Sequence, residues 1–529
     1  VYLSLILLLI VFGIFVNIGS VIKLVDIRIR TDINKKIKPK LISVQSSLEY
    51  KHIENDKSWE QISRVMRDPA IAILDGFVAY CTVIQIVVSI FSVLGLLWIH
   101  VWWSVVVIVM FSVPLFILSL CAGKKNYRSG QEAERFNRRT EYLDSVLSGR
   151  DNIEERVIFG YGDVIINRWS KQYEAGRKLQ LRVSLKQFAA MKGASMMLAL
   201  ISLLIAVTLL NPVVSGELSI GLFTGIVSSI FGVINKIASQ TSDSMEKISR
   251  NREYMKDLNL FLNLTKTQDA LVKPEKKQME FESLEFIDVR FRYPAGENDI
   301  LKGMNFKLKK GKHYAIVGKN GEGKSTITKL ITGLYPEYEG TILLNGRDIK
   351  SFRMSEIKAI FSVVYQDFAK FAVSLRDNIV LGDVAHMDDS RVDSLVEIAG
   401  MENLVKDLKY GLDTYLGKIH SEGQDISGGQ WQKVAILRSL ISQAPFRILD
   451  EPTSALDPIS ESKIYEEFEK LLSDKTTIFI SHRLGSTKLA DEILVVNDGI
   501  VAEKGTHEEL MAMKAIYFDM YESQRSWYL

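Results

Sequence analysis

Cysteine is almost absent from this chain of 529 residues, which contains two, Cys81 and Cys121. Both lie in apolar runs and lack the spacing of a disulfide framework or of a metal site, so neither kind of cross-link is expected. We interpret them as small buried thiols. A strong charge of one sign is missing as well, since the net charge is +3. Nothing global therefore points to a nucleic-acid partner.

An initiator methionine is also lacking, because the chain begins at Val1, inside an apolar run. We therefore expect a segment before Val1, and no signal peptide can be judged from this end. The length exceeds one ordinary domain of about 100–200 residues. Apolar residues make up 47% of the chain and gather before about residue 240. The sequence predicts an α-helical transmembrane domain in residues 1–265 and an α/β domain in residues 280–529, joined by a charged stretch.

Five stretches are long and apolar enough to cross a membrane, because a bilayer core about 30 Å thick needs about 20 apolar residues in a helix. Buried helices of a soluble protein do not explain them, since soluble helices average about 11–12 residues. The predicted spans are Val1 to about Leu24, Ala70 to Trp98, Val101 to Ala122, Ala189 to Leu210, and Leu218 to Ile237.

Loop charge predicts the orientation of these spans. The connections from Lys23 to Arg67 and from Lys124 to Lys186 are long and basic, whereas the other two are short. The positive-inside rule places the long ones in the cytoplasm. Five spans then leave Val1 outside, and one further span before it would give six. Asp75 lies near the cytoplasmic end of its span, where an interfacial position is favoured over a proton or substrate site.

The strongest motif lies between an apolar strand pattern at 314–317 and a helix pattern at 327–331, and it fits G-x-x-x-x-G-K-[ST]. Its glycines let backbone amides approach phosphate oxygens, and the helix N-terminus adds a positive partial charge. We predict that Lys324 reaches the β- and γ-phosphates of ATP and that Ser325 binds Mg²⁺. The predicted phosphate loop comprises Gly318, Lys319, Asn320, Gly321, Glu322, Gly323, Lys324, Ser325 and Thr326.

A second strand pattern, residues 446–449, ends in Asp450 and Glu451. A carboxylate at such a strand end can hold the Mg²⁺ shell, which we assign to Asp450. The next carboxylate can polarise the attacking water, so Glu451 is the predicted catalytic base.

A third motif opens a helical run upstream of that strand and consists of Ser427, Gly428, Gly429 and Gln430. In this order, the motifs resemble those of ATP-binding-cassette (ABC) transporters, and the resemblance covers about residues 281–515. It implies a P-loop ABC ATPase domain. Together with the apolar spans, it resembles an exporter-type half-transporter, in which a membrane bundle precedes the cassette.

Four further positions take their roles from this resemblance. Tyr293 resembles the aromatic residue that stacks on adenine. Gln366 resembles the residue that touches Mg²⁺ and senses the membrane domain, so the implied metal ligands are Ser325, Gln366 and Asp450. Residues 454–457 resemble the loop at the dimer interface. His482 resembles the switch histidine at the γ-phosphate and joins Glu451 as a catalytic residue.

The resemblance also implies a dimer that uses ATP and Mg²⁺. In the family, each ATP lies between the phosphate loop of one cassette and the signature motif of the other. The signature corresponds here to Ser427, Gly428, Gly429 and Gln430, so Ser427 and Gly429 would act on the ATP of the other chain. The intact motifs favour a homodimer, and a heterodimer stays open. The basic connections match the family's intracellular loops, with short coupling helices near residues 48–57 and 150–160.

Two residues depart from the family pattern. Arg447 lies where an apolar strand residue is usual, and nothing in the sequence explains it. Lys418 lies where an acidic residue is usual, ahead of the signature.

The sequence therefore predicts ATP-driven export across the cell membrane of a bacterium, with the ATPase domain in the cytoplasm. Short stretches around residues 365–371, 429–432 and 524–528 resemble bacterial exporters of lantibiotic-like peptides. A lipid flippase or multidrug exporter of the same fold is the alternative. Two other functional classes are alternatives to an exporter. One is a soluble ABC protein that regulates translation or repair, which the predicted spans argue against. The other is a membrane ATPase that acts as a sensor or channel regulator.

Overall fold

The computed structural model describes residues 2–100, single positions between 102 and 132, and residues 136–149, 152–216, 218–277, 279–452, 475–481, 487 and 490–525. The chain divides into two compact units, one of residues 1–42 with 61–263 and one of residues 43–60 with 264–529. The segment 43–60 thus groups with the C-terminal unit, although it lies in the sequence before most of the helices. The predicted domain limits, 1–265 and 280–529, stay a prediction.

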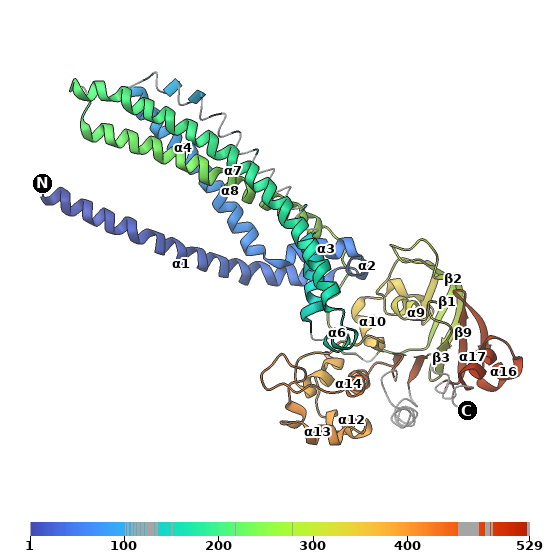
Figure 1. Ribbon diagram of the computed structural model, residues 1–529. Helices are drawn as coiled ribbons and strands as arrows, with labels where there is room; N and C mark the ends of the chain where they lie inside the picture. The colour runs from blue at the N-terminus through green and yellow to red at the C-terminus, as the bar shows by residue number, and fades with distance from the viewer. Residues whose placement is uncertain are drawn as a thin grey trace. The chain divides into compact units, whose positions relative to one another are not determined.

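Long helices build the first unit (Figure 1). Among them, α8 packs against both α4 and α7, and the three run side by side. Ser219 begins α8, since its hydroxyl accepts the backbone N–H of Leu222 at 3.2 Å and so caps the helix. The helices of this part of the chain are α1 (Tyr2–Ser47), α3 (Asp56–Arg67), α4 (Pro69–His100), α6 (Ile153–Phe159), α7 (Gly162–Val214) and α8 (Ile220–Leu262).

Uninterrupted apolar length is concentrated in α4. Within the described residues, Pro69–Ile99 is the one helical segment long and apolar enough to cross a membrane, and a single such helix is weak evidence for a span. The helices α7 and α8 carry shorter apolar stretches, Ser202–Val214 and Ile220–Gly232. Of the third predicted span, only single positions are described. The count of five spans therefore stays a prediction.

Both cysteines are exposed, so the expectation of buried thiols is wrong for this chain by itself. Cys81 lies on α4, where bulky apolar neighbours such as Phe77 and Ile84 are also more than 60% exposed. An apolar run therefore does not imply burial here, because these side chains of α4 are exposed.

Asp75 has a charged partner inside the first unit. Its carboxylate accepts a hydrogen bond from Nη2 of Arg30 at 3.1 Å, and Arg30 also bonds Asp26 at 2.7 Å. The contact joins α1 to α4 across 45 residues of sequence. A compensated carboxylate in an apolar helix has a structural role that requires neither proton transfer nor substrate binding.

Two sheets form the second unit. The smaller is antiparallel, in the order β2-β1-β4-β5. The larger has the order β10-β9-β3-β8-β7-β6, and all of its strands are parallel except the edge strand β10. The strands are β1 (Ser283–Phe291), β2 (Leu301–Lys309), β3 (His313–Val317), β4 (Glu339–Leu344), β5 (Arg347–Asp348), β6 (Phe361–Val364), β7 (Phe446–Asp450), β8 (Thr476–Ile480), β9 (Glu492–Asn497) and β10 (Ile500–Gly505).

The central strands of the larger sheet are covered on both faces. Every residue of β7 and β8 is buried, as expected of the central strands of a parallel sheet. Phe446 and Ile448 pack into one apolar cluster, and Leu449 into another on the opposite face. The helices of this unit are α2 (Tyr50–Glu54), α9 (Lys324–Ile331), α10 (Met354–Ile360), α11 (Leu375–Val380), α12 (Val392–Ile398), α13 (Glu402–Asp407), α14 (Gly428–Leu440), α16 (His507–Met513) and α17 (Ile516–Arg525).

The short helix α2 belongs to the second unit and contacts α9 and the loop that follows it. The Glu54 carboxylate accepts a hydrogen bond from Lys329 Nζ at 2.9 Å and another from the Tyr335 hydroxyl. The Tyr50 ring meets the Tyr335 ring edge-on, with centroids 5.6 Å apart. Lys51 forms an ion pair with Glu337 at 2.7 Å. Charge and aromatic contacts thus hold this turn of helix on α9 and the loop that follows it.

Short helices therefore occupy both regions in which coupling helices are expected, α2 within 48–57 and α6 within 150–160. Gly160 ends α6 in the left-handed conformation, with φ of 60°, which glycine adopts without strain. Their function as coupling helices stays a prediction.

Glu54→Ala is expected to loosen α2 from its seat, because it removes the acceptor shared by Lys329 and Tyr335. The contact is partly exposed, so we expect a loss of about 1 kcal/mol. Hydrogen exchange of the amides of residues 50–54 should then become about fivefold faster.

The matched control is Glu337→Ala. Glu337 is 71% exposed, and its partner Lys51 keeps a second ion pair with Glu49 at 2.7 Å. Equal acceleration in both variants would show that Glu54 does not anchor α2.

Candidate nucleotide-binding site

The phosphate loop runs from the end of β3 to the start of α9, as predicted. Two of its glycines are required by the surrounding structure. A Cβ atom on Gly318 would lie 2.3 Å from the carbonyl oxygen of Val496. Gly323 precedes α9 with φ of 95°, and a Cβ there would lie 2.7 Å from Leu301. Side chains are therefore excluded where the backbone turns into the helix.

Lys324 is buried inside this loop, with 5% of its surface exposed. Its Nζ donates hydrogen bonds to the carbonyls of Gly318 and Lys319, both at 2.8 Å. Burial lowers the pKa of Lys324, and the nearby carboxylates of Glu451 and Asp450 act in the opposite direction. The ammonium is thus held where phosphate oxygens can replace backbone carbonyls as its acceptors.

Tyr293 lies beside the loop, as expected of an adenine-stacking residue. Its hydroxyl is 2.9 Å from the Thr326 hydroxyl, and its ring packs edge-on against Phe291 and Tyr335 with centroids 5.0 and 5.5 Å away. The Lys329 ammonium lies 5.0 Å from the ring centroid. These contacts fix the ring at the mouth of the phosphate loop.

Two carboxylates lie at the end of β7. Burial raises the pKa of Asp450 to about 6, against a hydrogen bond from Ser325 that lowers it. Glu451 follows in the left-handed conformation, with φ of 49°, and its N–H bonds the Ile480 carbonyl at 2.8 Å. A non-glycine residue in this conformation is strained, which is common at functional sites. Gln366 Nε2 donates to the Glu451 carboxylate at 3.1 Å.

These elements enclose a cavity of about 520 Å³. Ile300, just before β2, was not predicted; it belongs to no motif, and only the fold brings it to the site. Asn320 to Thr326 are predicted loop residues, and all of them except Glu322 line the cavity. The lining residues are Tyr293, Ile300, Asn320, Gly321, Gly323, Lys324, Ser325, Thr326, Gln366 and Glu451.

The signature residues lie elsewhere. Ser427 caps α14 by accepting the Gln430 N–H at 3.3 Å, while the Gln430 side chain accepts the Ser427 N–H at 2.8 Å. Within the described part of the chain, neither they nor Gly428 and Gly429 line the cavity. Lys418 lies 3.6 Å from Asp425 in an exposed ion pair just ahead of the signature. His482 and residues 454–457 lie outside the described residues.

The site suits a magnesium ion. One carboxylate oxygen of Asp450, Oδ1, is buried and has no hydrogen-bond partner among the described residues. The Ser325 hydroxyl bonds Asp450, and the Gln366 amide lines the same cavity as Ser325. Both side chains offer oxygen atoms, which Mg²⁺ prefers as ligands. Ser325, Gln366 and Asp450 could therefore hold Mg²⁺ together with phosphate oxygens.

Comparison with known proteins identifies the family. The ABC transporter family model matches residues 301–454. The ATP-dependent lipid A-core flippase of Pectobacterium atrosepticum is 30% identical over 469 residues, which cover 88% of this chain and 78% of that protein. The chain belongs to the ABC transporter family.

Other relatives agree over nearly the whole chain. The subtilin transport ATP-binding protein SpaT of Bacillus subtilis is 29% identical over 94% of this chain and 81% of its own length. The nisin transport ATP-binding protein NisT of Lactococcus lactis is 29% identical over 94% of this chain and 83% of its own length. A bacterial Atm1-family ABC exporter solved with ATP bound superposes with a TM-score of 0.77 at 23% identity, over 98% of this chain and 90% of that one.

The ABC transporter described here is an exporter driven by ATP hydrolysis. Its fold is that of the Atm1-family exporter, with a helical N-terminal region and an ATPase domain built on sheets. ATP use is thereby established, and family membership implies a second cassette and a transported substrate.

Asp450→Asn is expected to stabilise the nucleotide-free transporter at pH 7.5 while abolishing hydrolysis. The folded-state pKa of about 6 exceeds the ordinary value of 3.8. The folded protein therefore binds more protons between these values, and stability falls as pH rises through this window. The variant should gain at most about 3 kcal/mol in the free energy of unfolding at pH 7.5. Thermal unfolding should show this gain shrinking as the pH falls toward 4.

Asp498→Asn is the control, since Asp498 is 75% exposed beside Lys302. A gain of the same size and pH dependence in both variants would exclude burial of Asp450 as its cause.

Proposed function

We propose that this transporter exports a peptide across the cytoplasmic membrane as one half of a dimer. The observation that carries the proposal is the similarity to the subtilin and nisin transport proteins over 94% of the chain. This similarity extends through the helical N-terminal region, the part of an exporter that meets its cargo, and is not confined to the cassette. Both relatives come from bacteria, which supports a bacterial cell membrane as the location of this transporter.

In this proposal, the helical region spans the membrane several times and the ATPase domain lies in the cytoplasm. The apolar segment Pro69–Ile99 and the shorter apolar stretches of α7 and α8 support it. The paired charges of Arg30 and Asp75 would lie toward the cytoplasmic side, where the predicted loops are basic.

The residues of the ATP site then take distinct roles. Tyr293 stacks on adenine, Lys324 and the loop amides bind the phosphates, and Glu451 polarises the attacking water. His482 contacts the γ-phosphate. Mg²⁺, held by Ser325, Gln366 and Asp450, would neutralise phosphate charge. Positioning and charge neutralisation carry most of phosphoryl transfer, and the buried Lys324 provides both.

The signature acts in the other half of the dimer. Ser427 and Gly429 lie at the N-terminus of α14, and the ATP cavity of their own chain is lined by other residues. A helix N-terminus attracts phosphate oxygens. Two chains arranged head to tail would therefore complete each other's sites. Intact motifs favour a homodimer, and a heterodimer would conserve the same contacts.

A lipid flippase is the second candidate. The lipid A-core flippases of Pectobacterium and Salmonella are 30% identical over 88% of this chain. The two candidates differ in what the helical region accepts, and both use the same ATP chemistry.

Stimulation of ATP hydrolysis in lipid vesicles distinguishes these cargoes. The purified transporter is expected to hydrolyse ATP at least about twofold faster with a lantibiotic precursor peptide. A lipopolysaccharide core lipid serves as the matched probe. Stimulation by the lipid but not by the peptide would replace the peptide proposal with the flippase.

Glu451→Gln is expected to bind ATP and to hydrolyse it at least about 100-fold more slowly, because the amide cannot accept a proton from water. With ATP, the variant should accumulate as closed dimers, seen by cross-linking or size. Glu422→Gln is the control, because Glu422 is an exposed carboxylate paired with Lys409 on the loop before the signature. Near-normal hydrolysis by Glu451→Gln would remove Glu451 as the base.

A further inference from the structure

Arg447 is a buried cation within β7, and 3% of its surface is exposed. Burial and the nearby Arg391 lower its pKa to about 10. Its guanidinium pairs with no carboxylate in the part of the chain that the structure describes. A buried charge without compensation is strongly unfavourable, so another group must stabilise it.

The C-terminal end of α14 compensates one side of the guanidinium, whereas Nε and Nη1 have no hydrogen-bond partner among the described residues. Nη2 of Arg447 donates to the carbonyls of Leu440 at 3.2 Å and Ser442 at 3.0 Å. Arg391 donates to the intervening carbonyl of Ile441 at 3.4 Å. The last carbonyls of a helix lack partners within it and carry a partial negative charge. Two arginines therefore cap three consecutive carbonyls where α14 ends.

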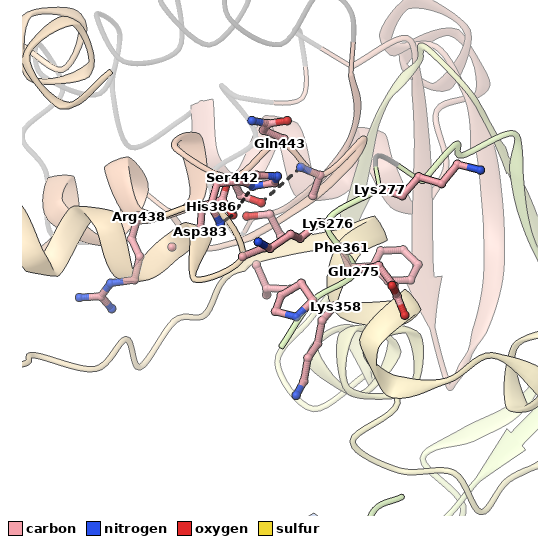
Figure 2. A pocket seen from close by; sticks show the side chains of 17 residues that line it. Glu275, Lys276, Lys277, Lys358, Phe361, Asp383, His386, Arg438, Ser442 and Gln443 are labelled. Atoms are coloured by element: carbon pink, nitrogen blue, oxygen red, sulfur yellow. Dashed lines mark hydrogen bonds and ion pairs between the residues drawn. The ribbon is translucent and has the colours of Figure 1, made fainter. Parts of the chain in front are cut away.

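The end of α14 is packed on one side, where Leu440 and Ile441 are buried in an apolar cluster. The turn after it borders a cavity of about 200 Å³, which is lined in part by Ser442, Gln443, Lys358 and His386 (Figure 2). Hydrogen bonds to the carbonyls thus add to the apolar packing at the end of the helix.

The other end of α14 is the signature. The helix has 13 residues, a rod about 20 Å long, and Ser427 closes its N-terminus. Along its length, it is tied to the larger sheet: Gln432 donates to the Glu451 carbonyl at 3.1 Å, and Ser439 meets Ser362 at 2.9 Å. A shift of its C-terminal end along the helix axis would move the signature by a similar amount.

We propose that Arg447 is a positioning residue for ATP hydrolysis. It fixes the position of the signature residues relative to the strand that carries Asp450 and Glu451. Arg447 belongs to that same strand, so one side chain joins the two features. The inference rests on the proposed dimer, in which these features serve two different ATP molecules. Arg447 would then fix the spacing between the two sites.

Arg447→Met and Arg447→Lys test this in the full-length dimer in lipid. The Met variant is expected to lower kcat about tenfold, because the cap is lost and the signature shifts in the closed dimer. ATP affinity without Mg²⁺ should change less than about twofold, since the cavity of the same chain contains no signature residue. The Lys variant keeps the charge with fewer donors and should fall between the Met variant and the parent.

Thr477→Ala is the matched control. Thr477 is buried and pairs directly with Arg447 across β7 and β8, and its hydroxyl has no hydrogen-bond partner among the described residues. Its kcat should stay near that of the parent even where the melting temperature falls. A loss of kcat that follows the melting temperature equally in Arg447 and Thr477 variants would overturn the positioning role, as would an unchanged kcat. If the Met variant does not fold, the comparison of Arg447→Lys with Thr477→Ala decides.

Closure of the dimer separates this inference from the function on which it rests. In a Glu451→Gln background, ATP should close the dimer, and adding Arg447→Lys should raise the ATP concentration required by about threefold or more. Failure of Glu451→Gln alone to close would refute the dimer. Closure equal in the single and the double variant would refute only the role of Arg447.

Discussion

The ATPase domain depends on keeping a cation and a carboxylate out of water at one edge of its larger sheet. Lys324 follows β3 and Asp450 ends β7, and burial shifts the pKa of each toward its neutral form. The parallel order of the strands brings both groups to the same edge. In the proposed ATP site, both groups are buried before ATP arrives, so little reorganisation would remain for the reaction, which is how fixed charges contribute most to catalysis. The required glycines and the strained Glu451 follow from the same crowding.

Much of this edge could be predicted from the sequence, because each motif is contiguous. The motifs of the phosphate loop, the end of β7 and the start of α14 each consist of residues adjacent in the sequence, so spacing carries the information, although Asp450 and Glu451 take their partners Ser325, Gln366 and Ile480 from distant segments. Ile300 and the seat of Glu54 could not be predicted, since their partners come from distant parts of the chain. The exposed cysteines and the grouping of residues 43–60 with the C-terminal unit also depend on which faces the packing covers, which apolar patterning does not specify.

Buried cations in this domain share a preference for backbone carbonyls over carboxylates. Lys324 bonds two carbonyls of its own loop and Arg447 bonds two at the end of α14. The half-buried Arg438 likewise bonds the carbonyls of Asn378 and Ala369. Each cation thereby organises a stretch of main chain instead of neutralising a single side chain. In β7, where the family pattern leads one to expect an apolar residue, the partial negative charge of the helix end accepts hydrogen bonds from the arginine.

The seat of α2 has a consequence for biosynthesis. Glu54 and Tyr335 are separated by 281 residues, so at about 5–20 residues per second the ribosome needs roughly 14–56 s to make the partner after the helix. During that interval, Tyr50 and Glu54 have no surface to bind, while the apolar helices between them and the cassette are being made. The earliest part of the second unit therefore has to wait for a partner made 281 residues later, whereas strands β6 to β10 of the same unit are made only after that partner.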